Sequence, residues 1–96
     1  MKGRYKTMKN YSWDEVEQKL KSLKIQLGID IGTNNVRGEV MKLTEEAFDI
    51  CDVTIPKIGA ARGYVKLGKE EDAKFLFTKI TLKIRRLEEI MKMIEA

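Results

Sequence analysis

The sequence contains no histidine, one cysteine and one proline among its 96 residues. The absence of histidine removes the commonest general base and the commonest transition-metal ligand in proteins. Cys51 is alone and cannot form an intrachain disulfide, and without histidine the chain offers no ligand set for a structural zinc site. We therefore expect a non-enzymatic protein of the cytoplasm that holds no metal and no cofactor.

Long apolar runs are also missing, because no stretch approaches the roughly 20 apolar residues that a membrane-spanning helix requires. The basic start MKGRYKTMKN has no apolar segment behind it, so the sequence predicts neither a signal peptide nor a membrane anchor. With 43% hydrophobic and 35% charged residues, the composition is that of a globular protein. We expect one domain over residues 12–96, preceded by a basic arm over residues 1–11 that is either ordered or disordered.

Two stretches, residues 1–12 and residues 53–69, hold basic residues and no acidic residue, although the net charge of the chain is only +4. Surfaces of this kind bind phosphate backbones through salt-sensitive contacts. The predicted contacts with nucleic acid or another polyanion are Lys2, Arg4, Lys6, Lys9, Lys57, Arg62, Lys66 and Lys69, with Tyr64 as a stacking residue. A solvated leader and an ordinary loop, with Tyr64 packed in the core, are the alternative.

The first helix has a clear start signal. Ser12 and Glu15 have the spacing of a capping box, in which each side chain accepts a hydrogen bond from the backbone N–H of the other. The apolar residues that follow are spaced three and four apart, so the pattern predicts a helix from about Trp13 to Lys24 with one buried face. These residues are Trp13, Val16, Leu20 and Leu23.

Beyond Lys24 the apolar residues alternate with polar ones, which is typical of a strand with one buried face. The sequence predicts a hairpin around the turn GTNN, a short helix that begins at Thr44 with Cys51 buried near its end, and two further short strands. Pro56 would end the third strand, and the glycines of IGAARG would form a mobile loop before the fourth. The four predicted strands cover residues 25–31, 36–42, 53–55 and 64–67.

The C-terminal segment is the largest feature. Seven apolar residues from Ala73 to Ile94 alternate in spacings of four and three, which predicts one helix of some 26 residues. Residues 75–84 are rich in aromatic and β-branched side chains, so a strand is the alternative there. In a helix, Phe75 and Leu82 lie opposite the buried stripe. We expect them to contact a second copy of the chain in a homodimer, or the sheet of a monomer.

The segment GIDIGTNNVRG, residues 28–38, resembles the first phosphate loop of the actin, hexokinase and Hsp70 ATPase superfamily. The resemblance implies a nucleotide-binding fragment in which Asp30 lies near a metal while Gly32, Thr33 and Asn34 line the phosphates. It covers eleven of the 96 residues, and a chain of this length has no room for the second domain of that superfamily. A hairpin turn that uses the freedom of glycine is the alternative.

The predicted fold class is therefore α+β, with a small, mainly antiparallel sheet of three to four strands packed against a long C-terminal helix and a shorter N-terminal helix. The leading function prediction is a non-enzymatic, homodimeric protein that binds nucleic acid or another polyanion through its basic stretches. An interaction or assembly module that uses the C-terminal helix is the alternative. A nucleotide-binding fragment is the third.

Overall fold

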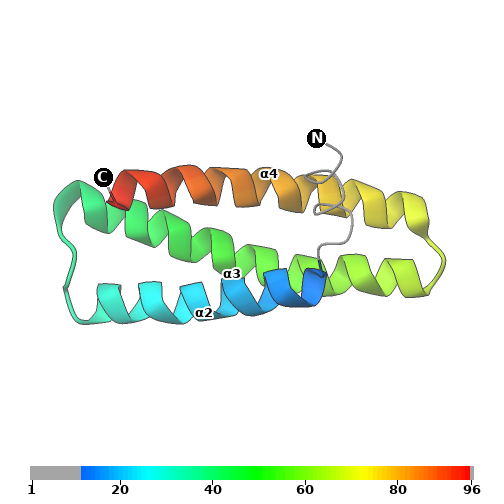
Figure 1. Ribbon diagram of the computed structural model, residues 1–96, viewed down its shortest axis with the longest axis horizontal. Helices are drawn as coiled ribbons and strands as arrows, with labels where there is room; N and C mark the ends of the chain where they lie inside the picture. Colours follow the sequence, from blue (N-terminus) through cyan, green and yellow to red (C-terminus); the bar gives the residue numbers. More distant parts are fainter. Residues whose placement is uncertain (1–11, 96) are drawn as a thin grey trace.

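The computed structural model describes residues 12–95, and every element in that range is an α-helix. Helix α2 spans Trp13–Gly32, α3 spans Gly38–Lys66 and α4 spans Glu70–Glu95. The helices follow one another in an antiparallel, up-down-up arrangement, with α3 between α2 and α4 (Figure 1). The predicted α+β fold class and its sheet are wrong, whereas the long C-terminal helix is confirmed.

The start of α2 is as predicted, because the Ser12 hydroxyl accepts a hydrogen bond from the backbone N–H of Glu15 at 3.4 Å. The helix does not stop at Lys24 but continues to Gly32. Residues 25–31 had suggested a strand because isoleucine and leucine alternate with polar residues. Only Leu27 of that set is buried, whereas Ile25 and Ile29 are 65% and 50% exposed. The core stripe keeps its helical spacing, and the alternation comes from apolar residues on the outer face of the same helix.

The turn GTNN is confirmed as a turn, but it ends a helix instead of closing a hairpin. Asn34 adopts a left-handed conformation with φ of 57°, and the N–H of Asn35 donates to the carbonyl of Asp30 at 3.0 Å. The N–H of Asn34 also donates to the carbonyl of Ile31 at 3.3 Å. These two bonds form a Schellman motif, which satisfies carbonyls that the last turn of α2 leaves unpaired.

Helix α3 replaces the last three predicted strands, the short helix and the mobile loop of the prediction. Thr44 does not cap a helix: it is buried inside α3, and its hydroxyl donates to the carbonyl of Val40 at 2.7 Å. Pro56 lies on the exposed side of the same helix and supplies no N–H to its hydrogen-bond ladder. The helix ends at Lys66 with Leu67 as its C-cap, and Gly68 with φ of 78° begins the turn into α4.

The reason α3 is one helix is a stripe of buried residues with alternating spacings of three and four. Most of its members are small, so the backbones of α2 and α4 can both approach α3 closely. Pro56 and two glycines lower the intrinsic helix propensity of α3. This packing outweighs their effect, since tertiary contacts supply most helical stability in proteins. The stripe comprises Thr44, Ala47, Cys51, Thr54, Ile58 and Ala61.

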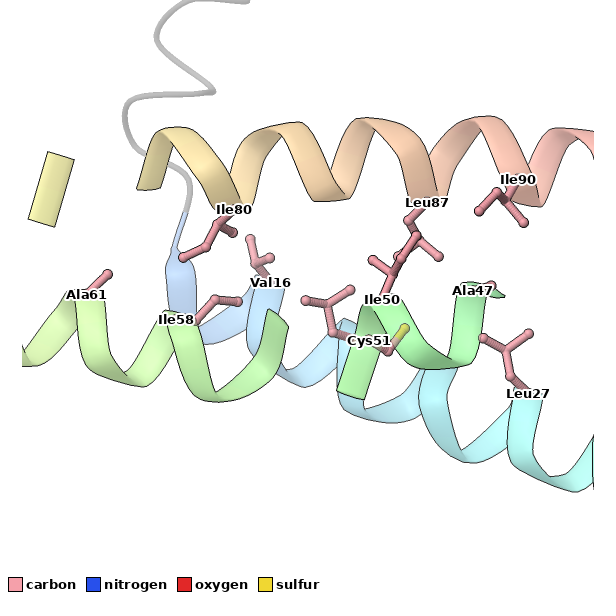
Figure 2. Close-up of a cluster of buried hydrophobic side chains, with 11 residues drawn as sticks. Val16, Leu27, Ala47, Ile50, Cys51, Ile58, Ala61, Ile80, Leu87 and Ile90 are labelled. Atoms are coloured by element: carbon pink, nitrogen blue, oxygen red, sulfur yellow. The ribbon is translucent and has the colours of Figure 1, made fainter. Parts of the chain in front are cut away.

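The core lies where α4 and α2 meet this stripe. Figure 2 shows Ile80 opposite Ile58, and Leu87 and Ile90 over the N-terminal half of α3. Helices α2 and α4 also touch directly at one end, where the rings of Trp13 and Phe77 stack with centroids 4.7 Å apart. Residues 12–95 form one small core, so each large buried side chain contributes a sizeable share of the stability.

Candidate interaction surfaces

The face of α4 that points away from the core carries a second stripe with the spacing of a heptad. Its apolar members are Phe75, Leu82 and Met93, which are 63%, 58% and 45% exposed. The spacings along the stripe are four, three, four, three and four, so the side chains follow one line along the helix. We call this set the outer stripe of α4: Phe75, Lys79, Leu82, Arg86, Glu89 and Met93.

Charged groups hold the middle of the outer stripe in place. The Arg86 guanidinium donates to both carboxylate oxygens of Glu46 on α3, from Nε to Oε2 at 3.0 Å and from Nη2 to Oε1 at 3.3 Å. It also lies 3.5 Å from the carboxylate of Glu89 one turn further on. Hydrogen bonds with Glu46 raise the pKa of Arg86 above its ordinary value. Lys79 lies over the ring of Phe75, with the ammonium 4.7 Å from the ring centroid.

The apolar surface continues from α4 onto α3. Residues 46, 53, 60 and 67 follow each other at seven-residue intervals, so they lie along one side of α3. Because Glu46 reaches Arg86, that side of α3 adjoins the outer stripe of α4. Val53 is 42% exposed and Leu67 is 72% exposed. The described part of the chain has eight exposed large apolar side chains; three lie on the outer stripe of α4, and two more, Val53 and Leu67, follow Glu46 at heptad spacing.

The predicted polyanion-binding residues are not gathered in one place. Arg62 pairs with Asp14 and, at 3.3 Å, with Glu17, so its charge is engaged in joining α3 to the start of α2. Lys57 and Lys66 are nine positions apart on one helix, which puts them on opposite sides of it. Lys66 and Lys69 are exposed at the turn between α3 and α4.

The other residues of that prediction add no common surface. Tyr64 is half-buried in the last turn of α3 and does not lie on a strand. Lys2, Arg4, Lys6 and Lys9 lie outside the described residues. Binding to nucleic acid or another polyanion therefore stays a prediction. The segment IGAARG, predicted as a mobile loop within the second basic stretch, is part of α3.

The proposed phosphate loop does not have the geometry that the resemblance implies. Gly28, Asp30 and Gly32 all belong to α2, and Thr33 and Asn34 form its C-terminal cap. A phosphate loop of that superfamily needs a strand before and after the turn, whereas here a helix lies on each side. Within residues 12–95, moreover, no group of three or more acidic or cysteine side chains could hold a metal ion.

A shallow groove runs along the outer side of α2 and α3. Gly28 allows α2 and α3 to approach there, since a Cβ atom at this position would lie 3.3 Å from Cε2 of Phe48. Lys24 closes part of the groove by pairing with Asp52 at 2.7 Å. The residues that line it are Lys21, Lys24, Ile25, Gly28, Phe48 and Ile55. This surface has fewer exposed apolar side chains than the α3–α4 side. Variants of the α2 surface therefore serve as controls for variants of the outer stripe.

Cys51 is buried, as predicted, but in the middle of α3 and not near the end of a short helix. Burial raises the pKa of its thiol from 9.0 to about 11, and the positive charge of Lys24 offsets only part of this effect. The thiol therefore stays protonated at neutral pH and is a poor nucleophile.

This shift predicts a loss of stability at high pH. Below pH 9 the thiol is protonated in both the folded and the unfolded chain, so it does not change the free energy of unfolding. Between about pH 9 and 11 the thiol ionises only in the unfolded chain. The free energy of unfolding therefore falls as the pH rises through this range. Denaturant unfolding at pH 8, 9, 10 and 11 should show a steeper fall in the free energy of unfolding for the wild type than for Cys51→Ala. The titration of the lysines is common to both proteins, so it does not contribute to the difference between them. Parallel pH profiles would contradict a buried, protonated thiol.

No family model matches the chain. The comparisons with curated proteins and with solved structures likewise find no significant similarity, so the geometry of the molecule carries the functional argument alone. No helix within residues 12–95 is long and apolar enough to cross a membrane.

Sequence reasoning found the exposed side of α4 but missed its extension onto α3. The signal was present, because Val40, Thr44, Ala47, Cys51, Thr54, Ile58, Ala61 and Val65 have alternating spacings of four and three. Threonine, alanine and cysteine contribute little to a hydrophobicity pattern, however. Without α3 as a helix, Val53 and Leu67 could not be assigned to the side of Glu46.

Proposed function

We propose that this protein is a non-enzymatic assembly module of the cytoplasm that associates with itself through the outer stripe of α4. The observation that carries the proposal is the exposure of Phe75 and Leu82 on the face of α4 that points away from the core. Exposed apolar side chains that are scattered singly are normal, whereas a continuous line of them marks a contact surface. Met93 extends this line along α4, and Val53 and Leu67 are exposed at heptad spacing from Glu46, the residue of α3 that Arg86 contacts.

The size of the chain supports self-association. Three helices bury one small core, and α4 packs on α3 and α2 along only one of its faces. A second copy that covers the outer stripe would add apolar contacts at no further cost in chain length, which is how small domains often gain stability. The buried thiol of Cys51 and the lack of a second cysteine support a reducing compartment.

The test is the mass of the protein in solution. We expect sedimentation equilibrium to give a mass near twice the 11.1 kDa of one chain for the wild type. We expect Phe75→Glu and Leu82→Glu to shift the mass toward the monomer, because each would put a carboxylate into the contact. Their helical circular dichroism should not change, since both side chains are exposed.

Lys74→Glu is the matched control, because Lys74 is an exposed residue of α4 outside the outer stripe. This variant should keep the wild-type mass. A wild-type mass of one chain at all concentrations up to about a millimolar would sink the proposal. So would an unchanged mass in both Phe75→Glu and Leu82→Glu.

A further inference from the structure

The order of residues in the outer stripe of α4 decides which surface of a second copy it fits. Read from the N-terminus, the six positions are aromatic, basic, apolar, basic, acidic and apolar. The charges are therefore unequal in the two halves of the stripe: the first half has Lys79, and the second half has Arg86 and Glu89. A stripe of this kind is complementary to itself only when one of the two copies is reversed.

We infer, on the basis of the proposed function, that the surface on the second copy is the same outer stripe of α4, packed antiparallel about a two-fold axis. In the central register Phe75 faces Met93 of the second copy, Lys79 faces Glu89, and Leu82 faces Arg86. Each pair occurs twice because of the symmetry. All six positions then have a partner: two apolar layers, two layers of opposite charge, and two in which leucine packs on the aliphatic stem of arginine.

Other arrangements of the two helices leave groups unmatched. A parallel pair places Lys79 against Lys79, Arg86 against Arg86 and Glu89 against Glu89, so every charged layer is repulsive. An antiparallel pair shifted by one heptad in either direction leaves Phe75 or Met93 without a residue of α4 opposite it. The central antiparallel register alone pairs both ends of the stripe.

The contacts within one chain prepare the surface for this pairing. Glu46 holds the guanidinium of Arg86 on the side of α3, so the stem of Arg86 is fixed beside the line of apolar residues. Glu89 lies 3.5 Å from the same guanidinium, at the edge of the stripe, where its carboxylate can reach Lys79 of the second copy. Lys79 is in none of the ion pairs within residues 12–95, and its ammonium lies over the ring of Phe75.

The outer face of α2 is a poorer match for the stripe. Ile25 and Ile29 are exposed there, and the positions before them at the same three-four spacing, Gln18 and Ser22, carry no charge. The nearby Lys21 and Lys24 are already paired with acidic residues of the same chain. Docking of α4 on α2 would also join two different surfaces, and unless each copy uses both surfaces on the same partner, such contacts build open chains or rings. The antiparallel α4 pair instead closes after two copies.

Charge reversal tests the register. Lys79→Glu places two acidic residues in each charged layer and Glu89→Lys places two basic residues there, so each single variant should raise the dissociation constant of the dimer about tenfold at low salt. The double variant Lys79→Glu/Glu89→Lys restores opposite charges in both layers. It should return to within about threefold of the wild type, and Lys74→Glu, with the same charge change outside the stripe, should not weaken the dimer. Sedimentation equilibrium at one low salt concentration measures all four, with circular dichroism to verify folding.

The outcomes separate this inference from the proposed function. If Phe75→Glu dissociates the dimer but neither Lys79→Glu nor Glu89→Lys does, self-assembly through α4 stands and the antiparallel register is overturned. A double variant that is no tighter than the singles overturns the register as well. If Ile25→Glu dissociates the protein as strongly as Phe75→Glu, α2 is the partner surface and the two-fold α4 pair is wrong. A monomeric wild type removes the proposed function itself.

Discussion

Replacing Ile80 by alanine is expected to lower the free energy of unfolding by about 3–4 kcal/mol, within the range for a large aliphatic side chain removed from a core. Ile80 is fully buried in the middle of α4 and lies opposite Ile58 of α3 (Figure 2). Its removal leaves a cavity between two helices that are fixed by contacts on both sides, so the site cannot close completely. Urea denaturation at a fixed protein concentration measures the change.

Ile25→Ala is the matched control for this variant, since it removes the same atoms from a side chain that is 65% exposed. Its effect should stay below about 0.5–1 kcal/mol. Equal losses in the two variants would mean that residues 25–31 bury an apolar face after all, as the alternating pattern had suggested.

The second large effect is expected from Ala47→Leu, which should lower the free energy of unfolding by about 1–3 kcal/mol through overpacking. Ala47 has no exposed surface, and Leu27 of α2 and Ile90 of α4 lie around it (Figure 2). A larger side chain at this position must push at least one of the neighbouring helices away from α3. Thermal and denaturant unfolding both report the loss.

Ala60→Leu is the control for Ala47→Leu in the same helix, because Ala60 is exposed, whereas its neighbour Ala61 belongs to the buried stripe. Leucine is nearly as good a helix former as alanine, so we expect little change in stability. If Ala47→Leu is tolerated equally well, the small residues of α3 do not set the distance between the helices.

Local signals in the sequence predicted the elements whose ends and stripes are strong. The capping pair of Ser12 and Glu15 correctly predicts the start of α2, and the seven-residue stripe from Ala73 to Ile94 predicts α4. Both depend on large apolar side chains or on side-chain caps, which act through neighbours a few residues away. The exposed position of Phe75 and Leu82 follows from the same stripe and is confirmed.

The sequence misled where signals from two faces of one helix overlap. Along Ile25–Ile31 the core residue Leu27 and the exposed Ile25 and Ile29 together imitate a strand. In α3, Pro56 and the glycines at positions 59 and 63 are strong helix breakers in isolation. They are tolerated in α3 because its opposite face packs against two helices. This packing joins residues far apart in the chain, so it cannot be predicted from short segments of sequence.

The environment of the predicted binding residue Arg62 could not be read from the sequence, because its ion-pair partners lie far away in the chain. Arg62 was assigned to a basic stretch without acids, but Asp14 and Glu17, 48 and 45 positions earlier, neutralise it in the folded protein. Charge patterns along the chain cannot show such pairs. Phe75 and Leu82, in contrast, lie within one helix, and their position opposite the buried stripe follows from spacing alone.

The most direct test of self-assembly through α4 is the concentration dependence of the backbone amide chemical shifts. Dilution of the wild type through its dissociation constant should move the signals of residues around Phe75, Leu82, Glu89 and Met93 and leave those around Ile25 and Ile29 in place. Shifts that move on α2 and not on α4, or that stay constant on both while the mass remains that of one chain, would contradict the account.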